Sequence, residues 1–242
     1  MSTALLSIEE MSISYGPAKA LFDVSIGVSE GQVLAILGPN GAGKSSLAKA
    51  VAGEVFPTQG RIFFGGKDVT KLSAHQMSRA GVAYLPEGSG VFRELSVVDN
   101  LRMFLRRGCS RKACGEHIER VFELFPELAA HKHQRGGTLS GGEQQMLSLA
   151  PALVQPPKLI IVDEPSLGLA PLLIDRVFET LEIARNEGVT IVLIEQYVHR
   201  ALAFATQCAI LQRGQLRWSG PTSGAHEEIM THYFGITEEM AG

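Results

Sequence analysis

The sequence predicts an α/β fold with a mostly parallel core sheet, an antiparallel β subdomain and an inserted helical subdomain. Three observations support this. Short β-branched apolar runs take turns with amphipathic stretches along the chain. Before them lie segments in which apolar and polar residues alternate. Strand signals vanish between about 90 and 155. With 242 residues, of which 45% are hydrophobic, the chain is long and apolar enough for one large folded domain.

Strands of two kinds are expected. Continuous apolar runs at 33–37, 82–85, 159–162 and 189–194 suit strands that are covered on both faces. Earlier in the chain, and at 61–64, the pattern is typical of half-exposed antiparallel strands. The residues of the early alternating pattern are Ile8, Met11, Ile13, Val24, Ile26 and Val28. An antiparallel sheet is therefore expected to pack beside the parallel one.

Helical periodicity follows at 97–107, 111–125 and 141–154. Residues Ser73 with Gln76, and Ser96 with Asp99, resemble the N-cap boxes that begin helices. The tail is expected to turn at Arg213-Gly214 between two short strands and to end in a helix at about 225–234.

One domain is expected over 1–242. Its core would combine 1–89 and 156–242 and include the antiparallel β subdomain, and its helical subdomain would be 90–155. Pro151 falls within the last of the three helical patterns, where proline costs about 3 kcal/mol. We therefore expect this helix to kink or end early.

Charge and composition exclude several classes of protein. The 22 Lys and Arg against 25 Asp and Glu give a net charge of -3, which provides no case for a protein that binds nucleic acid by phosphate neutralisation, although a local basic groove stays possible. The apolar runs are far shorter than the ~20 residues that span a bilayer, and the start lacks a basic signal region. A cytosolic chain is expected.

Cys109, Cys114 and Cys208 lack metal or disulfide spacing, so ordinary reduced thiols are expected.

A glycine-rich loop lies between an apolar strand and an apolar-periodic helix. Its residues are Gly38, Pro39, Asn40, Gly41, Ala42, Gly43, Lys44 and Ser45, followed by Ser46 on the helix. Glycines at these positions allow backbone amides to form a concave nest for phosphates. Lys44 would contact the β and γ oxygens, and the Ser45 hydroxyl would ligate Mg²⁺. A glycine-rich turn without a ligand is the alternative, which the flanking strand and helix disfavour.

Two carboxylates follow the strand at 159–162. Asp163 would support Mg²⁺ directly or through water, because this hard cation prefers carboxylate oxygen. Glu164, one residue further, would face the attacking water as the catalytic base. A strand-terminal acidic turn before Pro165 is the simpler explanation when the pair is taken alone. The phosphate loop reverses that preference.

The run from Leu139 to Gln145, LSGGEQQ, resembles the signature of ABC-transporter ATPase subunits. Ser140 with Glu143 also forms an N-cap box, so this helix tip presents amides to solvent. The resemblance implies a P-loop NTPase fold in which two subunits meet head to tail. Ser140, Gly141 and Gly142, with Glu143, would then bind the γ-phosphate of the partner's nucleotide in trans.

The resemblance covers nearly the whole chain and implies an ATP-binding aromatic at Tyr15. The alternative for Tyr15 is a core-facing side chain, since it continues the alternation of Met11 and Ile13. An aromatic favours a purine without separating ATP from GTP. Because the chain has no Asn-Lys-x-Asp guanine motif, ATP is the expected nucleotide.

Three departures from the general family pattern resemble ATP-binding subunits of branched-chain amino acid importers. Glu87 stands where most members have glutamine, Ala170 where most have aspartate, and Gln196 where most have the switch histidine. Glu87 can hold Mg²⁺ or its water. Gln196 can donate to the γ-phosphate but cannot titrate, so Glu164 should act as the base. His199 approaches the same side if its helix forms, although an exposed helical histidine needs no special role.

The resemblance also implies partners and a location. These are a second ATPase subunit, identical or related, and two integral-membrane permeases, with a periplasmic solute-binding protein contacted indirectly. The chain would sit on the cytoplasmic face of the inner membrane. Permease helices would dock beside residues 87–100, where Val91, Phe92, Leu95 and Val98 supply apolar contacts or belong to the core.

Two other classes stay open at this point. A soluble ABC ATPase of DNA repair or translation usually has paired cassettes or a long coiled coil, neither of which the sequence shows. A nucleotide-binding regulator without turnover is motivated by Glu87 and Gln196 and opposed by Glu164. Within the importer branch, urea, short amides and aromatic acids are alternatives to branched-chain amino acids.

Overall fold

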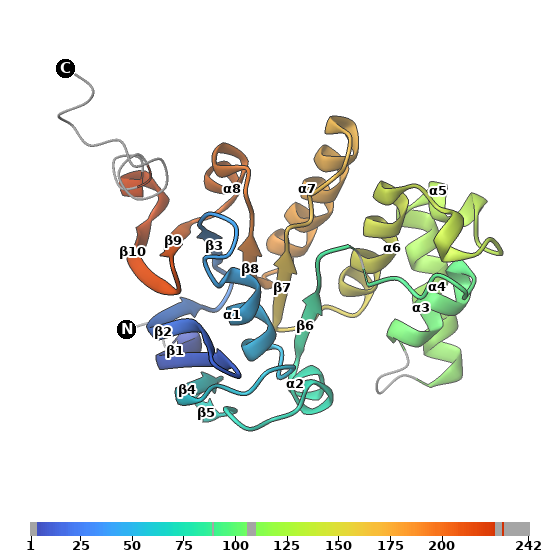
Figure 1. Ribbon diagram of the computed structural model, residues 1–242. Coiled ribbons are helices and arrows are strands. Elements are labelled where there is room, and N and C mark those ends of the chain that lie inside the picture. Colours follow the sequence, from blue (N-terminus) through green and yellow to red (C-terminus); the bar gives the residue numbers. More distant parts are fainter. Residues whose placement is uncertain (1–3, 89, 106–109, 226–228, 230–242) are drawn as a thin grey trace, which may run out of the picture. The chain divides into compact units, whose positions relative to one another are not determined.

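The computed structural model describes residues 4–88, 90–105, 110–225 and residue 229 (Figure 1). Internal contacts divide the chain into two compact units. The core unit runs up to Tyr84 and adds 158–163 and the chain from Thr190 onward; the helical unit comprises 85–157 and 164–189. These units group 164–189 with the helices, unlike the predicted boundaries of 90–155, and the predicted subdomain division stays a prediction.

An antiparallel sheet in the core unit has the strand order β2-β1-β4-β5. Its strands are β1 (Ala4–Tyr15), β2 (Ala18–Ser29), β4 (Gln59–Phe64) and β5 (Lys67–Asp68). Ile8 of β1 lies opposite Ile26 on one side and Ile62 on the other. Met11 and Ile13 are fully buried. The alternation in the sequence thus predicted this sheet and its buried face.

The described residues also form a six-stranded sheet with the order β10-β9-β3-β8-β7-β6. Its strands are β3 (Val33–Leu37), β6 (Val82–Leu85), β7 (Leu159–Asp163), β8 (Thr190–Ile194), β9 (Gln207–Gln212) and β10 (Gln215–Pro221). β3 is parallel to β8 and β9, and β7 is parallel to β8, while β10 is antiparallel to β9. Every residue of β3, β7 and β8 is buried, as their continuous apolar runs predicted.

The register of this sheet decides where the functional loops begin. Ile194 at the end of β8 lies opposite Ile36 of β3 and Asp163 of β7. Because parallel strands end at one edge, the segments that follow these three strands leave the sheet together. This is the edge at which open α/β sheets bind ligands.

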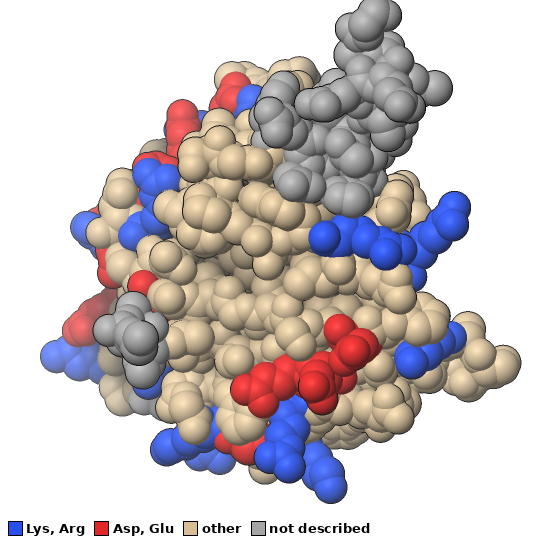
Figure 2. Space-filling view, turned by 90° about the vertical axis from the view of Figure 1, so that its left-hand side faces the viewer, with Lys and Arg blue, Asp and Glu red and all other residues tan. Residues whose placement is uncertain are grey.

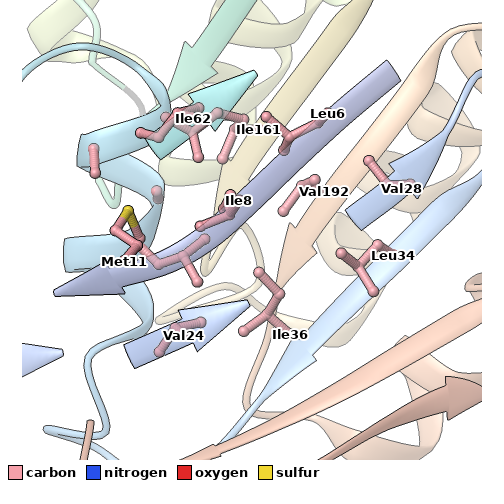
Figure 3. Packing of buried hydrophobic residues seen from close by; sticks show 14 of the residues in the cluster. Leu6, Ile8, Met11, Val24, Val28, Leu34, Ile36, Ile62, Ile161 and Val192 are labelled. Carbon is pink, nitrogen blue, oxygen red and sulfur yellow. The ribbon is translucent and has the colours of Figure 1, made fainter. Parts of the chain in front are cut away.

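The main core cluster lies between the two sheets (Figure 3). Leu6 and Ile8 of β1 point toward Ile36 of β3 and Val192 of β8, so the sheets share one apolar layer. Helix α1 (Lys44–Val51) adds Leu47 and other side chains to the same cluster. The start of α1 is therefore anchored by buried apolar contacts, which stabilise by roughly 25 cal/mol per Å² of area removed from water. Helices α2 (Ala74–Ala80) and α8 (Val198–Phe204) belong to the same unit.

The helical unit confirms the three helical patterns. It contains α3 (Val97–Leu105), α4 (Arg111–Leu124), α5 (Pro126–Ala130), α6 (Gly141–Val154) and α7 (Pro171–Asn186), with a 3₁₀ turn at Gly136–Thr138. Helix α6 contacts α3, α4, α5 and α7, which explains why most of its side chains are buried. The predicted cap box at Ser96 is present, since its hydroxyl contacts the Asp99 carboxylate at 2.6 Å and accepts from the Asp99 amide. The predicted box of Ser73 with Gln76 begins α2.

Of the two outcomes expected at Pro151, the early helix end is wrong, because α6 continues to Val154, and the kink stays a prediction. The proline removes one donor, but its own carbonyl still accepts from the Gln155 amide at 3.0 Å. Ala150, Ala152 and Leu153 are buried around it. Tertiary packing thus offsets the local cost of the ring.

The end of the chain is confirmed as far as it is described. Arg213 and Gly214 both have positive φ, of 49° and 77°, and join β9 to β10 as predicted. A 3₁₀ turn follows at Thr222–Gly224. Most of the helix expected at 225–234 lies outside the described residues, as does Cys109. No helix in the described ranges is both long and apolar enough to cross a bilayer.

Candidate functional site

The phosphate loop (residues 38–45) connects β3 to α1, and its backbone path requires glycine at two points. A Cβ on Gly38 would lie 2.2 Å from the Leu211 carbonyl oxygen. Gly43 has φ +100°, and a Cβ there would lie 2.5 Å from Leu21 and 2.8 Å from the Ala20 carbonyl oxygen. The strand β9 and the start of β2 thus pack directly against the loop, which fixes its concave shape.

Lys44 is the charged residue of this loop. It is 4% exposed, and its Nζ donates to the carbonyl oxygens of Gly38 at 2.9 Å and Pro39 at 3.3 Å. The ammonium therefore lies against the loop's own backbone. Gly41 faces open space, because a Cβ there would meet no atom within 4 Å. The loop thus combines a buried cation with an accessible backbone rim, the arrangement that favours an anion.

Asp163 is held by two hydroxyl donors in the core unit. Ser45 Oγ donates to Asp163 Oδ1 at 3.3 Å, and the Tyr84 hydroxyl donates to Oδ2 at 3.2 Å. The carboxylate is 2% exposed at the end of β7. Sequence reasoning missed Tyr84. The signal was a tyrosine in an otherwise apolar run, on a strand that the sheet order makes the neighbour of β7.

These oxygens fit the donor set of Mg²⁺. The described residues contain no cluster of three or more His, Cys, Asp or Glu side chains able to hold a metal ion. Mg²⁺ bound to a nucleotide needs no such cluster, because it uses one or two protein oxygens and takes its other ligands from phosphate and water. Ser45 and Asp163, already in contact, supply two hard oxygen donors.

Tyr15, the last residue of β1, contacts the first turn of α1, because its hydroxyl donates to Ser46 Oγ at 3.3 Å. The side chain is 46% exposed, so the alternative of a core-facing Tyr15 is wrong. The alternation that buries Met11 and Ile13 breaks before Tyr15 at the end of β1. An accessible aromatic next to the start of α1 is what the proposed adenine contact needs.

The segment after β8 places Gln196 at the same edge of the sheet. Glu195 is 1% exposed, and its Oε2 accepts from the backbone amides of Gln196 at 2.9 Å and Tyr197 at 3.3 Å. Sequence reasoning missed this role of Glu195, which fixes the turn that carries Gln196. His199 is exposed on α8.

Glu164 begins the second part of the helical unit. It is 8% exposed and has a φ of +50°, a left-handed conformation that is uncommon for residues other than glycine. The following turn is closed by the Leu167 amide, which donates to the Glu164 carbonyl, and by Gln145 Nε2, which donates to the Pro165 carbonyl at 3.1 Å. Such backbone strain persists where surrounding contacts impose it, often at functional residues. Glu87 is exposed in a turn after β6.

The signature loop (residues 139–143) forms the N-terminus of α6. The Ser140 amide and hydroxyl both lie 2.8 Å from Glu143 Oε2, and the Glu143 amide donates back to Ser140 Oγ at 3.3 Å. The predicted cap box is thus present. Gly142 is buried against Leu173, which a Cβ would approach to 2.6 Å, whereas Ser140 and Gly141 are exposed. This tip presents the first amides of a helix to solvent.

The structure brings the predicted residues together in two groups. In the core unit, Tyr15 contacts Ser46, Ser45 contacts Asp163, and Lys44 contacts the backbone of the same loop. The helical unit gathers Ser140 to Glu143 at one helix tip. The roles assigned to these residues, and to Glu164, Glu87 and Gln196, stay predictions.

Comparisons of this chain with a family model and with curated relatives give consistent results. A family model described as ABC transporter matches residues 21–167. The chain is 41% identical over 214 residues to the high-affinity branched-chain amino acid transport ATP-binding protein BraG of Pseudomonas aeruginosa, covering 88% of this chain and 91% of BraG. It is 32% identical to a probable branched-chain amino acid transport ATP-binding protein, LivF, of Archaeoglobus fulgidus, covering 97% and 100%.

A solved structure has the same fold. The ADP conformation of MJ1267, an ATP-binding cassette of an ABC transporter, superposes with a TM-score of 0.81 at 26% identity, covering 97% of this chain and 100% of that one.

Proposed function

The chain belongs to the ABC transporter family, and on that premise we propose that it is the ATP-hydrolysing subunit of an importer for branched-chain or related small amino acids. The observation that carries the proposal is the joint contact of Lys44 with the phosphate loop and of Ser45 with Asp163. The solute is inferred from the 41% identity to a branched-chain amino acid transport protein.

ATP would bind with its phosphates in the nest of residues 38–45. The loop amides and the Lys44 ammonium would contact the phosphate oxygens, and Tyr15 would stack on adenine. Ser45 and Asp163 would hold Mg²⁺, with Glu87 as a further candidate for the metal or its water. When bound, Mg²⁺ neutralises charge on the phosphate oxygens.

Glu164 would orient water and accept its proton. Its carboxylate directly follows Asp163 in the chain, and its left-handed backbone is held by the turn that Gln145 closes. Gln196 would donate an amide hydrogen bond to the γ-phosphate. Because an amide cannot titrate, Gln196 would orient the phosphate without taking a proton.

The signature loop would act on the nucleotide of a second, identical or related subunit. Ser140 and Gly141 are exposed at a helix N-terminus, whose partial positive charge attracts an anion. Binding of ATP would draw two subunits together, and hydrolysis would release them. The same subunits would work with two integral-membrane permeases and, indirectly, with a periplasmic solute-binding protein.

The chain would sit on the cytoplasmic face of the inner membrane through those permeases. Residues 87–100 are the proposed docking segment. Phe92 is 46% exposed, and Val91, Leu95 and Val98 are half-buried, so this segment offers apolar contact area. The Phe92 ring also lies 5.8 Å from the Phe104 ring, centroid to centroid, and this contact holds it in place.

Two alternatives to an importer subunit are a nucleic-acid clamp, which the surface charge disfavours, and an exporter subunit, which a test must exclude. On the face in Figure 2, Lys and Arg lie in small groups among uncharged residues and an acidic patch, so this face lacks the continuous basic surface of a nucleic-acid clamp. Relatives that are 32% identical are named lipopolysaccharide export ATP-binding proteins, LptB, for example of Escherichia coli. An exporter subunit is therefore an outcome that the uptake test must exclude.

The test compares wild-type protein with Glu164→Gln and, as a control, Glu179→Gln on the exposed face of α7. Glu164→Gln should lower steady-state ATP hydrolysis by about 10²- to 10⁴-fold, the usual contribution of a general base. It should keep nucleotide binding and accumulate ATP-bound dimers in size-exclusion chromatography. Rapid turnover by Glu164→Gln would refute the assignment of the base.

The solute is tested in cells that lack the chain. Uptake of labelled leucine should fall and return with the wild-type gene, but not with Lys44→Ala. Unchanged leucine uptake with a defect in urea or amide uptake would assign another solute in the same branch, and a defect confined to the outer-membrane surface would assign an exporter.

A further inference from the structure

The signature loop carries a negative charge at the place where it would meet a nucleotide. Glu143 lies in the first turn of α6, and its side chain is 20% exposed. A carboxylate there stabilises the helix through its N-terminal partial charge. The same carboxylate opposes the approach of a γ-phosphate, because like charges a few ångströms apart repel even through partly screened surroundings. A loop that binds an anion while carrying Glu143 needs that charge held in place and offset.

Glu143 uses its two oxygens for different partners. Oε2 is 2.8 Å from both the amide and the hydroxyl of Ser140, which makes the cap box. Oε1 lies 3.4 Å from Nε2 of His131. His131 follows α5 immediately, at the start of the segment that leads into α6. His131 thus contacts the carboxylate oxygen of Glu143 that the cap box does not use.

The orientation of the imidazole ring supports a dedicated contact. His131 Nδ1 is buried without a hydrogen-bond partner among the described residues. Nε2 is the nitrogen that meets a partner, and it can carry a hydrogen in either charge state of the ring. Burying Nδ1 without a partner costs free energy. The contact of Nε2 with Glu143 is the interaction that this placement of the ring gains.

The loop itself is tied down independently of His131. Gln144 Nε2 donates to the carbonyl oxygens of Gly136 at 3.2 Å and Leu139 at 3.1 Å. The segment before the signature loop is therefore anchored by contacts that do not involve the His131 side chain, and removal of the imidazole should leave its backbone in place. His131 then affects the N-terminus of α6 through its contact with Glu143.

We propose that His131 is a positioning residue of the signature loop: it holds Glu143 against Ser140 and offsets the charge of Glu143 as the helix tip meets the γ-phosphate bound by a second chain. The proposal rests on the proposed function, because it needs the signature loop to act in trans. His131 does not touch the nucleotide in this account.

A double-mutant cycle tests the coupling between His131 and Glu143. All variants carry Glu164→Gln, and the readout is the ATP concentration that gives half-maximal dimerisation. His131→Leu should raise this concentration about fivefold, the equivalent of about 1 kcal/mol for one partly exposed charged contact. With Glu143→Gln present, His131→Leu should change it less than twofold, because the charge to be offset is gone. His131→Arg should restore the original value.

Controls separate positioning from a structural defect. His133→Leu, two residues further at an exposed position, should change nothing. Nucleotide affinity of the monomer should be the same in every His131 variant, because the phosphate loop belongs to the core unit. If His131→Leu is poorly folded, His131→Ala, which also removes the donor, replaces it in the cycle.

The possible failures are distinguishable. Equal effects of His131→Leu with and without Glu143 would overturn the proposal, as would no effect in either background. Ser140→Arg places a bulky cation at the helix tip and should abolish ATP-driven dimers. If dimers persist in Ser140→Arg, the trans action of the signature loop fails and the role of His131 fails with it. If Ser140→Arg abolishes dimers while the cycle is additive, only the role of His131 is refuted.

Discussion

The phosphate loop and the signature loop are both helix N-termini with glycines, yet their surroundings differ. At the phosphate loop the charged groups are buried: Lys44 of the loop is 4% exposed, Asp163 at the end of β7 is 2% exposed, and both make contacts within the core unit. In the signature loop Ser140 and Gly141 are exposed, and the polar contacts of the loop are mostly those of a cap box.

This difference separates binding from assembly. A buried cation beside an open backbone rim can take up a phosphate without help from another chain. An exposed helix tip whose carboxylate is already satisfied by its own serine has little affinity for a free anion. It becomes useful when another surface brings the anion to it, and we therefore expect substitutions in the first loop to affect nucleotide binding and those in the second to affect dimerisation.

The largest effect is expected for Lys44→Ala. Loss of a charge-assisted contact, worth about 1.5 to 3 kcal/mol, should weaken ATP binding by roughly 10- to 100-fold. Lys49→Ala, one turn further along α1, is the matched control and should bind normally. Equilibrium binding of a fluorescent ATP analogue to the monomer measures both. Equal affinities for Lys44→Ala and wild type would mean that this loop is not the phosphate site.

A smaller effect is expected for Tyr84→Phe. It removes one donor from Asp163 Oδ2 and leaves the ring in the core, so the carboxylate loses part of its orientation. Nucleotide affinity without Mg²⁺ should stay unchanged, while the Mg²⁺ concentration needed for tight binding should rise about fivefold, the value of one hydrogen bond of about 1 kcal/mol. Tyr197→Phe, at an exposed tyrosine, is the control. A Mg²⁺ titration unaffected by Tyr84→Phe would contradict a positioning role for this hydroxyl.

The smallest effect concerns the buried sheet beside β3, the strand that leads into the phosphate loop. Cys208 of β9 pairs with Ala35 of β3, and burial raises the pKa of its thiol from 9.0 to about 12. The unfolded chain therefore releases this proton at a lower pH than the folded chain does. The resulting contribution to stability is unchanged below pH 9 and is lost progressively between pH 9 and 12.

Urea unfolding as a function of pH measures this effect. The difference in unfolding free energy between wild type and Cys208→Ala should be constant up to about pH 9 and fall above it. A difference for Cys208→Ala that stays flat to pH 11 would mean that water reaches this layer.

Periodicity and glycine spacing predicted most of the fold and both loops. The runs at 33–37 and 159–162 are continuous because both faces of their strands are covered, and this signal is local to each strand. The cap boxes at Ser73, Ser96 and Ser140 were predictable for the same reason, since a box lies within four residues of chain. The early helix end expected at Pro151 was wrong because the local cost of proline is offset by packing from other helices, which no window of sequence contains.

The residues that sequence reasoning missed act across the chain. Tyr84 and Asp163 are 79 positions apart and meet because β6 and β7 are neighbours in the sheet. His131 reaches Glu143 because α5 and α6 pack together. Glu195 carried no distinct signal beside Gln196, although a buried carboxylate that accepts two backbone amides sets the turn. Pairings of this kind depend on strand order and helix packing.

Cross-linking between two chains tests the central claim most directly. One chain, with its native cysteines replaced, carries Asn40→Cys in the phosphate loop, and the other carries Ser140→Cys in the signature loop, both with Glu164→Gln. With ATP and a short bifunctional maleimide, the account predicts a cross-linked pair made of one chain of each kind, and no such pair with ADP. A cross-linked pair that forms equally with ADP, or none with ATP while the two chains still dimerise, would contradict the account.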